Sequence, residues 1–223
     1  MKTFREFLRE ARSGKTLYFC WGRFDPPTLG HAHLFNQLKV QATTNGADEW
    51  LIFPTRKPDY KKSFLTFEEK YKFLTELNPR FANKIIDDPE CNTVPNLILK
   101  YEKLGYSDFV LIAGDEDALG YEQMARSINK DPIYKEKFSA FTFQVPIIPE
   151  LKRKEGSGIS GMSSSKLKDI ISKGDKETFV ASYGTGNENI ANEIWDILEP
   201  YSTQLNKYVI SKQKLKDNTK SQI

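Results

Sequence analysis

The segment Thr16-Leu-Tyr-Phe-Cys-Trp-Gly-Arg-Phe-Asp-Pro-Pro-Thr-Leu-Gly-His31 decides the fold. Its first half, 16–22, is a short, aromatic-rich apolar run that ends at glycine, which predicts a buried parallel strand. A loop with two prolines follows, and a helix is predicted from about Leu29 to Thr44. Ligands of open α/β sheets bind at the carboxyl ends of the strands. The loop between this strand and this helix is therefore our first candidate for a binding site.

Strands and helices are predicted to alternate along the rest of the 223-residue chain. A capping box, Thr66 to Glu69, opens the second of these helices. This alternation predicts an α/β fold with a parallel sheet, helices on both faces and a C-terminal helical segment. Further strands are predicted at about 49–54, 84–86, 108–113 and 140–148, and further helices at about 66–77, 95–104, 116–129, 163–173, 176–183 and 187–198.

Three regions are predicted along the chain. Residues 1–14 form an amphipathic leader helix, because their apolar side chains share one helical face. Residues 15–183 form the α/β domain. Residues 184–223 form a C-terminal helix followed by a polar, lysine-rich tail that begins at Thr203 and is only partly ordered.

The composition excludes several classes of protein. Hydrophobic residues make up 39% and charged residues 28%, which is typical of a globular domain. A net charge of +3 does not favour a surface that coats nucleic acid. The apolar runs are too short to cross a bilayer, and no secretory core is present. We therefore expect no membrane partner. Cys20 and Cys91 lie far apart with no metal or redox spacing, so we expect a cytoplasmic protein.

The residues Thr28 to His31 begin the predicted helix after the first strand. Free N–H groups and the dipole at a helix start attract phosphate. His31 could donate an imidazole N–H to a phosphate oxygen, and Thr28 lies three residues away on the same face. Gly22 would let backbone approach a ligand closely. The alternative is an ordinary strand, proline turn and helix in which the histidine is satisfied internally.

A second candidate site lies far downstream, at Ile159-Ser-Gly-Met-Ser-Ser-Ser-Lys-Leu-Lys168. Ser163 is a suitable N-cap for the next helix. Serine hydroxyls and backbone N–H groups at a helix start, with Lys166 and Lys168 nearby, would form a second phosphate cradle. Alone, such a cluster is more often just a cap. Paired with the first motif, it favours a phosphate-binding site.

The first motif resembles the first signature of the nucleotidylyltransferase superfamily, Gly-x-Phe-Asp-Pro-x-(His/Thr)-x-Gly-His. That superfamily includes nicotinamide-mononucleotide and pantetheine-phosphate adenylyltransferases, and glycerol-phosphate and choline-phosphate cytidylyltransferases. The resemblance implies a Rossmann-like sheet and a triphosphate bound and stabilised by His31 and Thr28. The matching residues are Gly22, Phe24, Asp25, Pro26, Gly30 and His31, with Thr28 in place of the first histidine.

The second motif resembles the superfamily's other signature, Ile-Ser-Ser-(Ser/Thr)-x-(Ile/Leu/Val)-(Arg/Lys). Met162, Ser163, Ser164 and Ser165 align with it without a gap. The resemblance implies that Lys168 grips the β- and γ-phosphates. The resemblance implies that the two signatures meet across one sheet, and their separation of about 130 residues is compatible with this.

A third region of resemblance is the end of the predicted strand at 108–113, where Gly114 and Asp115 follow. Members of the superfamily often carry a Gly-(Ser/Asp/Ala)-Asp sequence there, near the base and ribose of the nucleotide. The alternative is a simple strand-to-helix turn in which Asp115 is the N-cap.

A basic loop spans 56–62. The chain in and after it resembles a bacteriophage branch of the superfamily in the order Asp59, Lys61, Lys62, Leu65, Thr66, Glu69 and Lys70, although Ser63 and Phe64 replace its Asn-Pro. A charged loop is often only solvated. Because this loop leaves the predicted sheet on the ligand side, we expect Lys62 or Arg23 to hold the phosphate of the acceptor.

The leader, 1–11, resembles the capsid-targeting leader of internal head proteins of bacteriophages. Leu8-Arg9-Glu10 before Ala11 resembles their protease cleavage pattern. This resemblance implies that the protein is found in the cytoplasm of an infected bacterial host and is also packaged in the virion. The alternative is a plain amphipathic helix that packs on the domain.

The expected activity is the transfer of AMP from ATP to a phosphorylated small molecule, first of all nicotinamide mononucleotide, with release of pyrophosphate. Mg²⁺ would bridge phosphate oxygens, held by substrate and water, and we expect no metal site on the protein. One alternative uses CTP and an alcohol phosphate. Another is a non-catalytic nucleotide-binding virion protein. P-loop and dehydrogenase types are disfavoured because neither glycine fingerprint is present.

Overall fold

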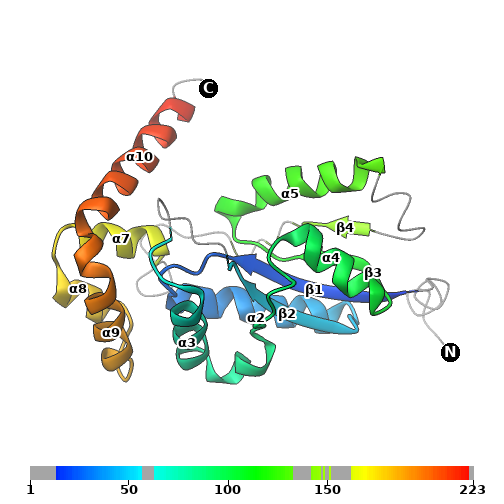
Figure 1. Ribbon diagram of the computed structural model, residues 1–223, viewed down its shortest axis with the longest axis horizontal. Coiled ribbons are helices and arrows are strands. Elements are labelled where there is room, and N and C mark those ends of the chain that lie inside the picture. The colour runs from blue at the N-terminus through cyan, green and yellow to red at the C-terminus, as the bar shows by residue number, and fades with distance from the viewer. Residues whose placement is uncertain are drawn as a thin grey trace. The chain divides into compact units, whose positions relative to one another are not determined.

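The computed structural model describes residues 14–56, 63–132, 142–146, 148, 151 and 162–220, with only the backbone for 115, 116 and 212–220. The chain forms two compact units (Figure 1). The first contains residues up to Trp21, Leu34–Phe53 and Ile86–Lys152, and the second contains Gly22–His33, Pro54–Ile85 and Arg153–Ile223. Residues 1–13 of the predicted leader, and Lys62, lie outside the described ranges.

The elements follow one another in an alternating order. Along the chain they are β1 (Lys15–Gly22), α2 (Leu29–Thr44), β2 (Glu49–Pro54), α3 (Phe67–Leu77), the 3-10 helix η1 (Pro79–Lys84), α4 (Val94–Lys103), β3 (Tyr106–Leu111), α5 (Asp115–Lys130), β4 (Thr142–Gln144), α7 (Ser164–Ser172), α8 (Lys176–Ala181), α9 (Glu188–Leu198), the 3-10 helix η4 (Glu199–Tyr201) and α10 (Ser202–Lys220).

The first unit is built on a four-stranded sheet in the order β2-β1-β3-β4. β1 pairs parallel with β3, and β3 pairs parallel with β4. Four consecutive residues of β1, 17–20, are buried, which requires that both faces of the sheet are covered. The prediction of an α/β fold with a parallel sheet flanked by helices is confirmed.

The connections of this sheet place its switch point between β1 and β3. The chain leaves β1 towards β2 and then returns across β1 to β3. Right-handed crossovers therefore put α2 on one face and α4 and α5 on the other (Figure 1). The Tyr121 hydroxyl of α5 donates to the Trp21 carbonyl at the end of β1, at 2.8 Å. This bond fixes α5 beside the carboxyl end of β1, where ligands of such sheets bind.

Aromatic rings fill the core of the first unit. Phe19 on β1 meets Phe53 edge-on, with ring centroids 6.2 Å apart, and stacks on Phe143 at 6.1 Å. All three side chains are almost completely buried. Together with the aliphatic residues of β3 and α4, they form one continuous apolar cluster.

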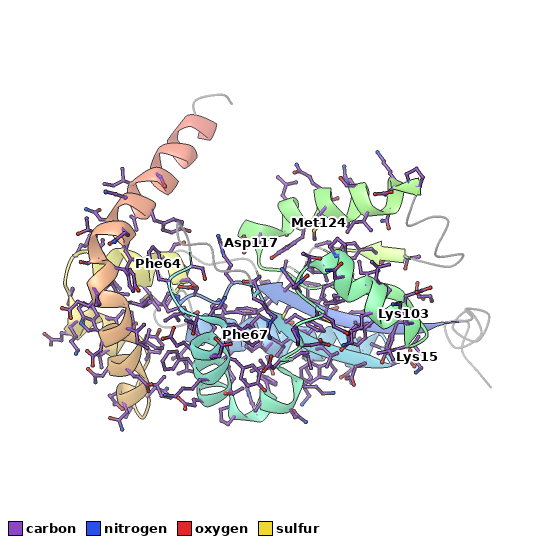
Figure 2. All side chains as sticks on the ribbon, in the orientation of Figure 1. Lys15, Phe64, Phe67, Lys103, Asp117 and Met124 are labelled. Carbon is purple, nitrogen blue, oxygen red and sulfur yellow. The ribbon has the colours of Figure 1, made fainter. Side chains whose placement is uncertain are left out.

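The second unit is mainly helical. Its core joins α3, α7, α8, α9 and α10 around Trp195, Tyr183 and Phe179. The predicted capping box of α3 is confirmed, because Glu69 N donates to the Thr66 hydroxyl and Thr66 N donates to the Glu69 carboxylate. Phe67 at the start of this helix is labelled in Figure 2.

Three predicted elements differ from the structure. The strand predicted at 84–86 is reduced to an isolated bridge at Ile85, with Ile86 N donating to Ile52 O at 2.8 Å, because η1 extends to Lys84. Of the described residues in the strand predicted at 140–148, those in β4 are extended in the sheet, and Pro146 beyond them has no N–H to donate to a ladder. The tail predicted from Thr203 is helical, because Leu205 anchors α10 in the core of the second unit.

No helix in the described part of the chain combines the length and the apolar character that a membrane span needs.

Candidate functional site: the loop and helix ends of the second unit

The loop after β1 is shaped by a close contact between Gly22 and the ring of Phe24. A Cβ added to Gly22 would lie 2.8 Å from that ring, so only glycine fits. Phe24 itself has φ 48°, a left-handed conformation that a bulky residue rarely adopts. Such strained positions concentrate at functional sites. The space that we expected Gly22 to offer to a ligand is occupied by this ring.

The ring of Phe24 in turn packs edge-on against the imidazole of His31, with centroids 4.9 Å apart. Thr28 N donates to His31 Nδ1 at 2.9 Å, and the Thr28 hydroxyl lies 3.3 Å from the same atom. Because Nδ1 accepts, the proton of a neutral ring is on Nε2. His31 is therefore a donor whose ring orientation and tautomer are fixed before any ligand arrives.

Thr28 is 2% exposed, and its backbone and hydroxyl both face His31. The sequence analysis expected this hydroxyl to donate to phosphate. The structure instead places Thr28 where it orients the imidazole. Gly30 is the second residue of α2 and lies between these two residues.

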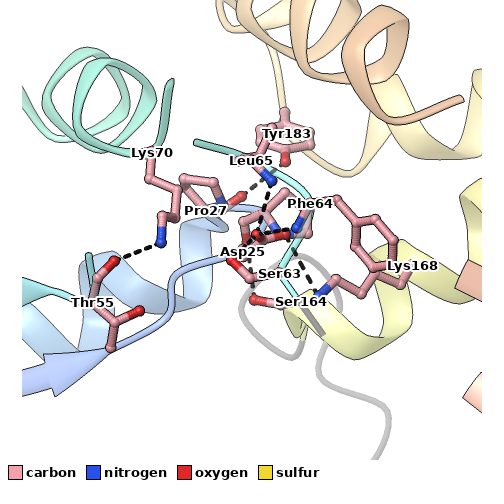
Figure 3. Close-up of polar contacts among 11 residues, drawn as sticks. Asp25, Pro27, Thr55, Ser63, Phe64, Leu65, Lys70, Ser164, Lys168 and Tyr183 are labelled. Carbon is pink, nitrogen blue, oxygen red and sulfur yellow. Dashed lines mark hydrogen bonds and ion pairs between the residues drawn. The ribbon is translucent and has the colours of Figure 1, made fainter. Parts of the chain in front are cut away.

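Asp25 is the hub of the site (Figure 3). Its Oδ2 accepts three hydrogen bonds from the segment before α3, from Ser63 Oγ at 2.6 Å, Phe64 N at 2.8 Å and Leu65 N at 3.1 Å. Its side chain is completely buried, and these three bonds hold one of its oxygens inside the protein. We expected Asp25 to bind nucleotide. The structure shows it tying the loop after β1 to the start of α3.

The other oxygen of Asp25 faces Lys168. The Lys168 ammonium lies 3.6 Å from Asp25 Oδ1, and that oxygen has no hydrogen-bond partner among the described residues. Lys168 is 3% exposed. A buried charge is tolerated when an opposite charge compensates it, and each of these two groups supplies that compensation to the other.

The second signature forms the start of α7. Ser163 is the N-cap as predicted, since Lys166 N donates to its hydroxyl at 3.2 Å. The Ser164 hydroxyl donates to the Pro26 carbonyl at 2.9 Å (Figure 3). The expected meeting of the two signatures is thus confirmed. Met162 packs against the core of the second unit, and Ser165 is half-buried in the first turn of the helix.

Tyr183 also holds the loop between β1 and α2. Its hydroxyl donates to the Pro27 carbonyl at 2.8 Å. Burial raises the pKa of Tyr183 well above its usual value, and the Asp25 carboxylate adds to this increase. The hydroxyl therefore stays protonated and keeps its role as a donor. Nothing in the sequence distinguished Tyr183 from an ordinary core aromatic.

Lys70 is a further residue that the sequence analysis did not assign to the site. It is 1% exposed, and its ammonium donates to the Thr55 carbonyl at 2.6 Å. Burial lowers the pKa of Lys70, the Asp25 carboxylate opposes that shift, and Arg23 adds to it. Its sequence signal is its place at an apolar position of α3, three residues after Phe67 and four before Leu74.

Two arginines accompany Lys70. Arg23 is exposed, and both Arg23 and Arg56 act on the pKa of Lys70 through their charge. The Arg56 guanidinium stacks on the Phe67 ring, with its Cζ 3.6 Å from the ring centroid. The loop after β1, the segment after β2 and the first part of α3 therefore each contribute one cation, and only that of α3 is buried.

Gly114 and Asp115 belong to the first unit. Gly114 is the N-cap of α5, so Asp115 is the first helical residue and not the cap. A Cβ added to Gly114 would meet nothing within 4 Å. The side chain of Asp115 lies outside what the structure describes.

The described residues include no group of three or more histidine, cysteine or acidic side chains that could hold a metal ion. Asp25, the acidic side chain at the centre of the site, is occupied by Ser63, the backbone before α3 and Lys168. The described residues therefore do not form a site for a metal ion held by the protein itself.

Comparison with known families identifies the chain. Residues 19–170 match the model of the cytidylyltransferase-like family, which is more than half of the 223 residues. The chain belongs to the cytidylyltransferase-like family. This membership supports a nucleotidyltransferase activity, which needs a nucleoside triphosphate and an acceptor. No individually curated protein matches the chain.

Proposed function

We propose that this member of the cytidylyltransferase-like family transfers AMP from ATP to a phosphorylated small molecule, with nicotinamide mononucleotide as the first candidate, and releases pyrophosphate. The observation that carries the proposal is the bond from Ser164 to the Pro26 carbonyl. It brings the start of α7 to the loop that leads into α2. Two helix N-termini, each with its N–H groups and positive dipole end, thus serve one region of the second unit.

The triphosphate is proposed to bind at these two helix starts. Ser163, Ser164 and Ser165 lie at the start of α7, and His31 lies in the first turn of α2. Lys168, one turn further along α7, is proposed to hold the β- and γ-phosphates. His31 donates through Nε2 because Thr28 N occupies Nδ1. A donor whose orientation is fixed in advance stabilises developing charge without reorganisation during the reaction.

The proposed reaction is an in-line displacement at the α-phosphorus. A phosphate oxygen of the acceptor forms the new P–O bond, and the bond between the α-phosphorus and the bridging oxygen breaks. The electron pair leaves with pyrophosphate. An ionised phosphate oxygen is already nucleophilic, so the chain needs no general base, and catalysis rests on positioning and charge stabilisation. Mg²⁺ bound to the triphosphate would neutralise part of its charge.

The acceptor's phosphate is proposed to bind the cations Arg23, Arg56 and Lys70. Guanidinium groups match phosphate oxygens in pairs, and a buried ammonium interacts more strongly because water screens it less. Lys62, expected for the same role, remains part of the proposal. An acceptor with a phosphate monoester suits this group of charges.

The nucleotide could also be CTP, with an alcohol phosphate as acceptor, and the family match supports this alternative equally. Thr28 and the Asp25-Pro26 pair favour ATP in the proposal, because pantetheine-phosphate adenylyltransferases resemble the chain there. A third proposal is a virion protein that binds nucleotide without reacting.

The test is pyrophosphate release by the purified chain with Mg²⁺. ATP and CTP are each paired with nicotinamide mononucleotide, phosphopantetheine, glycerol phosphate and choline phosphate. Release with ATP and nicotinamide mononucleotide supports the first proposal, and release with CTP and an alcohol phosphate replaces it. Tight binding of a triphosphate without release under any pairing would favour the binding protein.

A further inference from the structure

Two aromatic rings lie near the buried ammonium of Lys168. Its Nζ is 5.6 Å from the ring centroid of Phe64 and 5.0 Å from that of Tyr208. Both distances are within the range of a cation–π interaction. Phe64 is bound to Asp25 through its backbone N–H, so it belongs to the site already described. Tyr208 belongs to α10.

α10 lies beyond residue 170, where the match to the family ends. It packs on α7, and its Leu205 is fully buried in the core of the second unit. Tyr208 follows Leu205 by three residues, so the two side chains share one face of the helix. The face of α10 that anchors the helix therefore also delivers Tyr208 to Lys168.

We propose that Tyr208 is a positioning residue that holds Lys168 in place for the triphosphate, and that α10 is thereby a part of the phosphate-binding site. This inference rests on the proposed function. A lysine side chain has four flexible bonds and a compact charge, so its ammonium stays in one place only if its surroundings confine it.

Aromatic rings suit this confinement. The face of a ring attracts a cation through its quadrupole and accepts no directional hydrogen bond. A ring can therefore restrain an ammonium that also donates to an anionic oxygen. Asp25 supplies the opposing charge at 3.6 Å, and Tyr208 and Phe64 restrict the position. The ring of Tyr208 confines the ammonium, and its hydroxyl is not needed for this.

The first measurement concerns the position of Lys168 and does not depend on activity. The full chain is treated briefly with acetic anhydride, and acetylation of each lysine is followed by mass spectrometry of peptides. We expect Tyr208→Ala to raise the rate at Lys168 by about tenfold, the factor that corresponds to losing one buried cation–π contact. Tyr208→Phe should react like the wild type. Ile210→Ala, which removes an exposed side chain from the same helix, is the matched control.

The second measurement concerns the triphosphate. With the pair of substrates that gives pyrophosphate release, Tyr208→Ala should raise KM for the triphosphate by about tenfold, while Tyr208→Phe restores the wild-type value. KM for the acceptor should not change. Calorimetric titration with ATP and with CTP measures the same effect as an affinity, so it also works without turnover.

Each result decides one question. An unchanged acetylation rate in Tyr208→Ala shows that Tyr208 does not hold Lys168 and overturns the inference. Faster acetylation with unchanged KM and unchanged triphosphate affinity overturns it as well. Equal losses in Tyr208→Ala and Ile210→Ala would indicate general loosening of α10 and count against it. If the triphosphate affinity falls in Tyr208→Ala but the wild-type chain never releases pyrophosphate, the proposed reaction is removed and the positioning role stays intact.

Discussion

The two units differ in what they bury. In the first unit, the buried polar side chains of the described residues are limited to Asp108, which accepts from the Thr142 hydroxyl. The second unit buries polar groups repeatedly, among them Asp25, Lys70 and Lys168. Buried charges cost free energy unless they are paired, whereas buried apolar surface stabilises. The sheet of the first unit is thus built mainly for stability, and the loop and helix ends of the second unit retain costly groups for binding.

The largest expected effect follows from removing the hub. Asp25→Ala leaves Ser63 Oγ, Phe64 N and Leu65 N without this acceptor and removes the carboxylate that lies 3.6 Å from the Lys168 ammonium. We expect a loss of about 3–5 kcal/mol in the free energy of unfolding, as for breaking a buried ion pair. Urea denaturation measures it.

Phe19→Ala is the matched variant in the first unit. Loss of a core phenylalanine also costs about 3–5 kcal/mol. The folded fraction of this variant should nevertheless keep the wild-type KM for triphosphate, whereas Asp25→Ala should not. Equal effects of both variants on KM would erase the functional distinction between the units.

His31→Ala should reduce turnover by a factor of about a hundred or more, as expected when one preorganised donor is lost. Its effect on the melting temperature should be small, because the ring is only partly buried. Initial rates of pyrophosphate release measure the change. His33→Ala, an exposed position on the same helix, is the control, and similar turnover in both variants would contradict the role of His31.

Lys70→Ala should raise KM for the acceptor by about tenfold and leave KM for the triphosphate unchanged, since a hydrogen bond to a charged group contributes about 1.5–3 kcal/mol. Lys72→Ala is the control, because Lys72 lies on the same helix, is exposed and pairs with Glu193 of α9. A rise in KM for the triphosphate alone would instead assign Lys70 to the binding of the triphosphate.

The pKa of Lys70 adds a dependence on pH. Burial lowers this pKa, so the ammonium loses its proton at a lower pH than an ordinary lysine does. The folded state binds that proton less tightly than the unfolded chain, so the cost of burial is present at low pH and is relieved as pH rises through the lowered pKa. KM for the acceptor should therefore rise over the same interval. Lys70→Arg should remove this dependence, and its persistence would assign it to another group.

The smallest effect is expected at the cysteines of the first unit. Burial raises the pKa of Cys91 to about 12 and also raises that of Cys20. Since the thiolate is the reactive form, iodoacetamide at pH 8 should modify both slowly and without loss of activity. Rapid modification accompanied by inactivation would show that the core of the first unit contributes to the reaction, and would contradict the distinction between the two units.

The sequence predicted the parts of the molecule that depend on local pattern. The capping box of α3, the N-cap at Ser163 and the alternation of strands and helices were all readable, because each rests on residues near in sequence. The meeting of the two signatures could be expected only from their resemblance to a family. The helix α10 was not expected, since its polar sequence gives no sign of the contact that buries Leu205.

The roles within the site were harder to predict. Thr28 and Asp25 were expected to touch the nucleotide, yet they face His31 and Ser63 inside the protein. Motif spacing places a residue near a site but does not say whether its side chain points outwards. Lys70 was given no role because a lysine in a helix is usually solvated, although its place at an apolar position of α3 was a signal of its burial.

The link between Asp25 and Lys168 has a consequence for how such chains can diverge. Both charges are buried and each compensates the other. A substitution that removes one of them therefore makes the burial of the other more costly in free energy. Neighbouring positions of this kind are energetically coupled rather than additive. In related sequences, an acid at position 25 and a base at position 168 should therefore be inherited or lost together, as a single character.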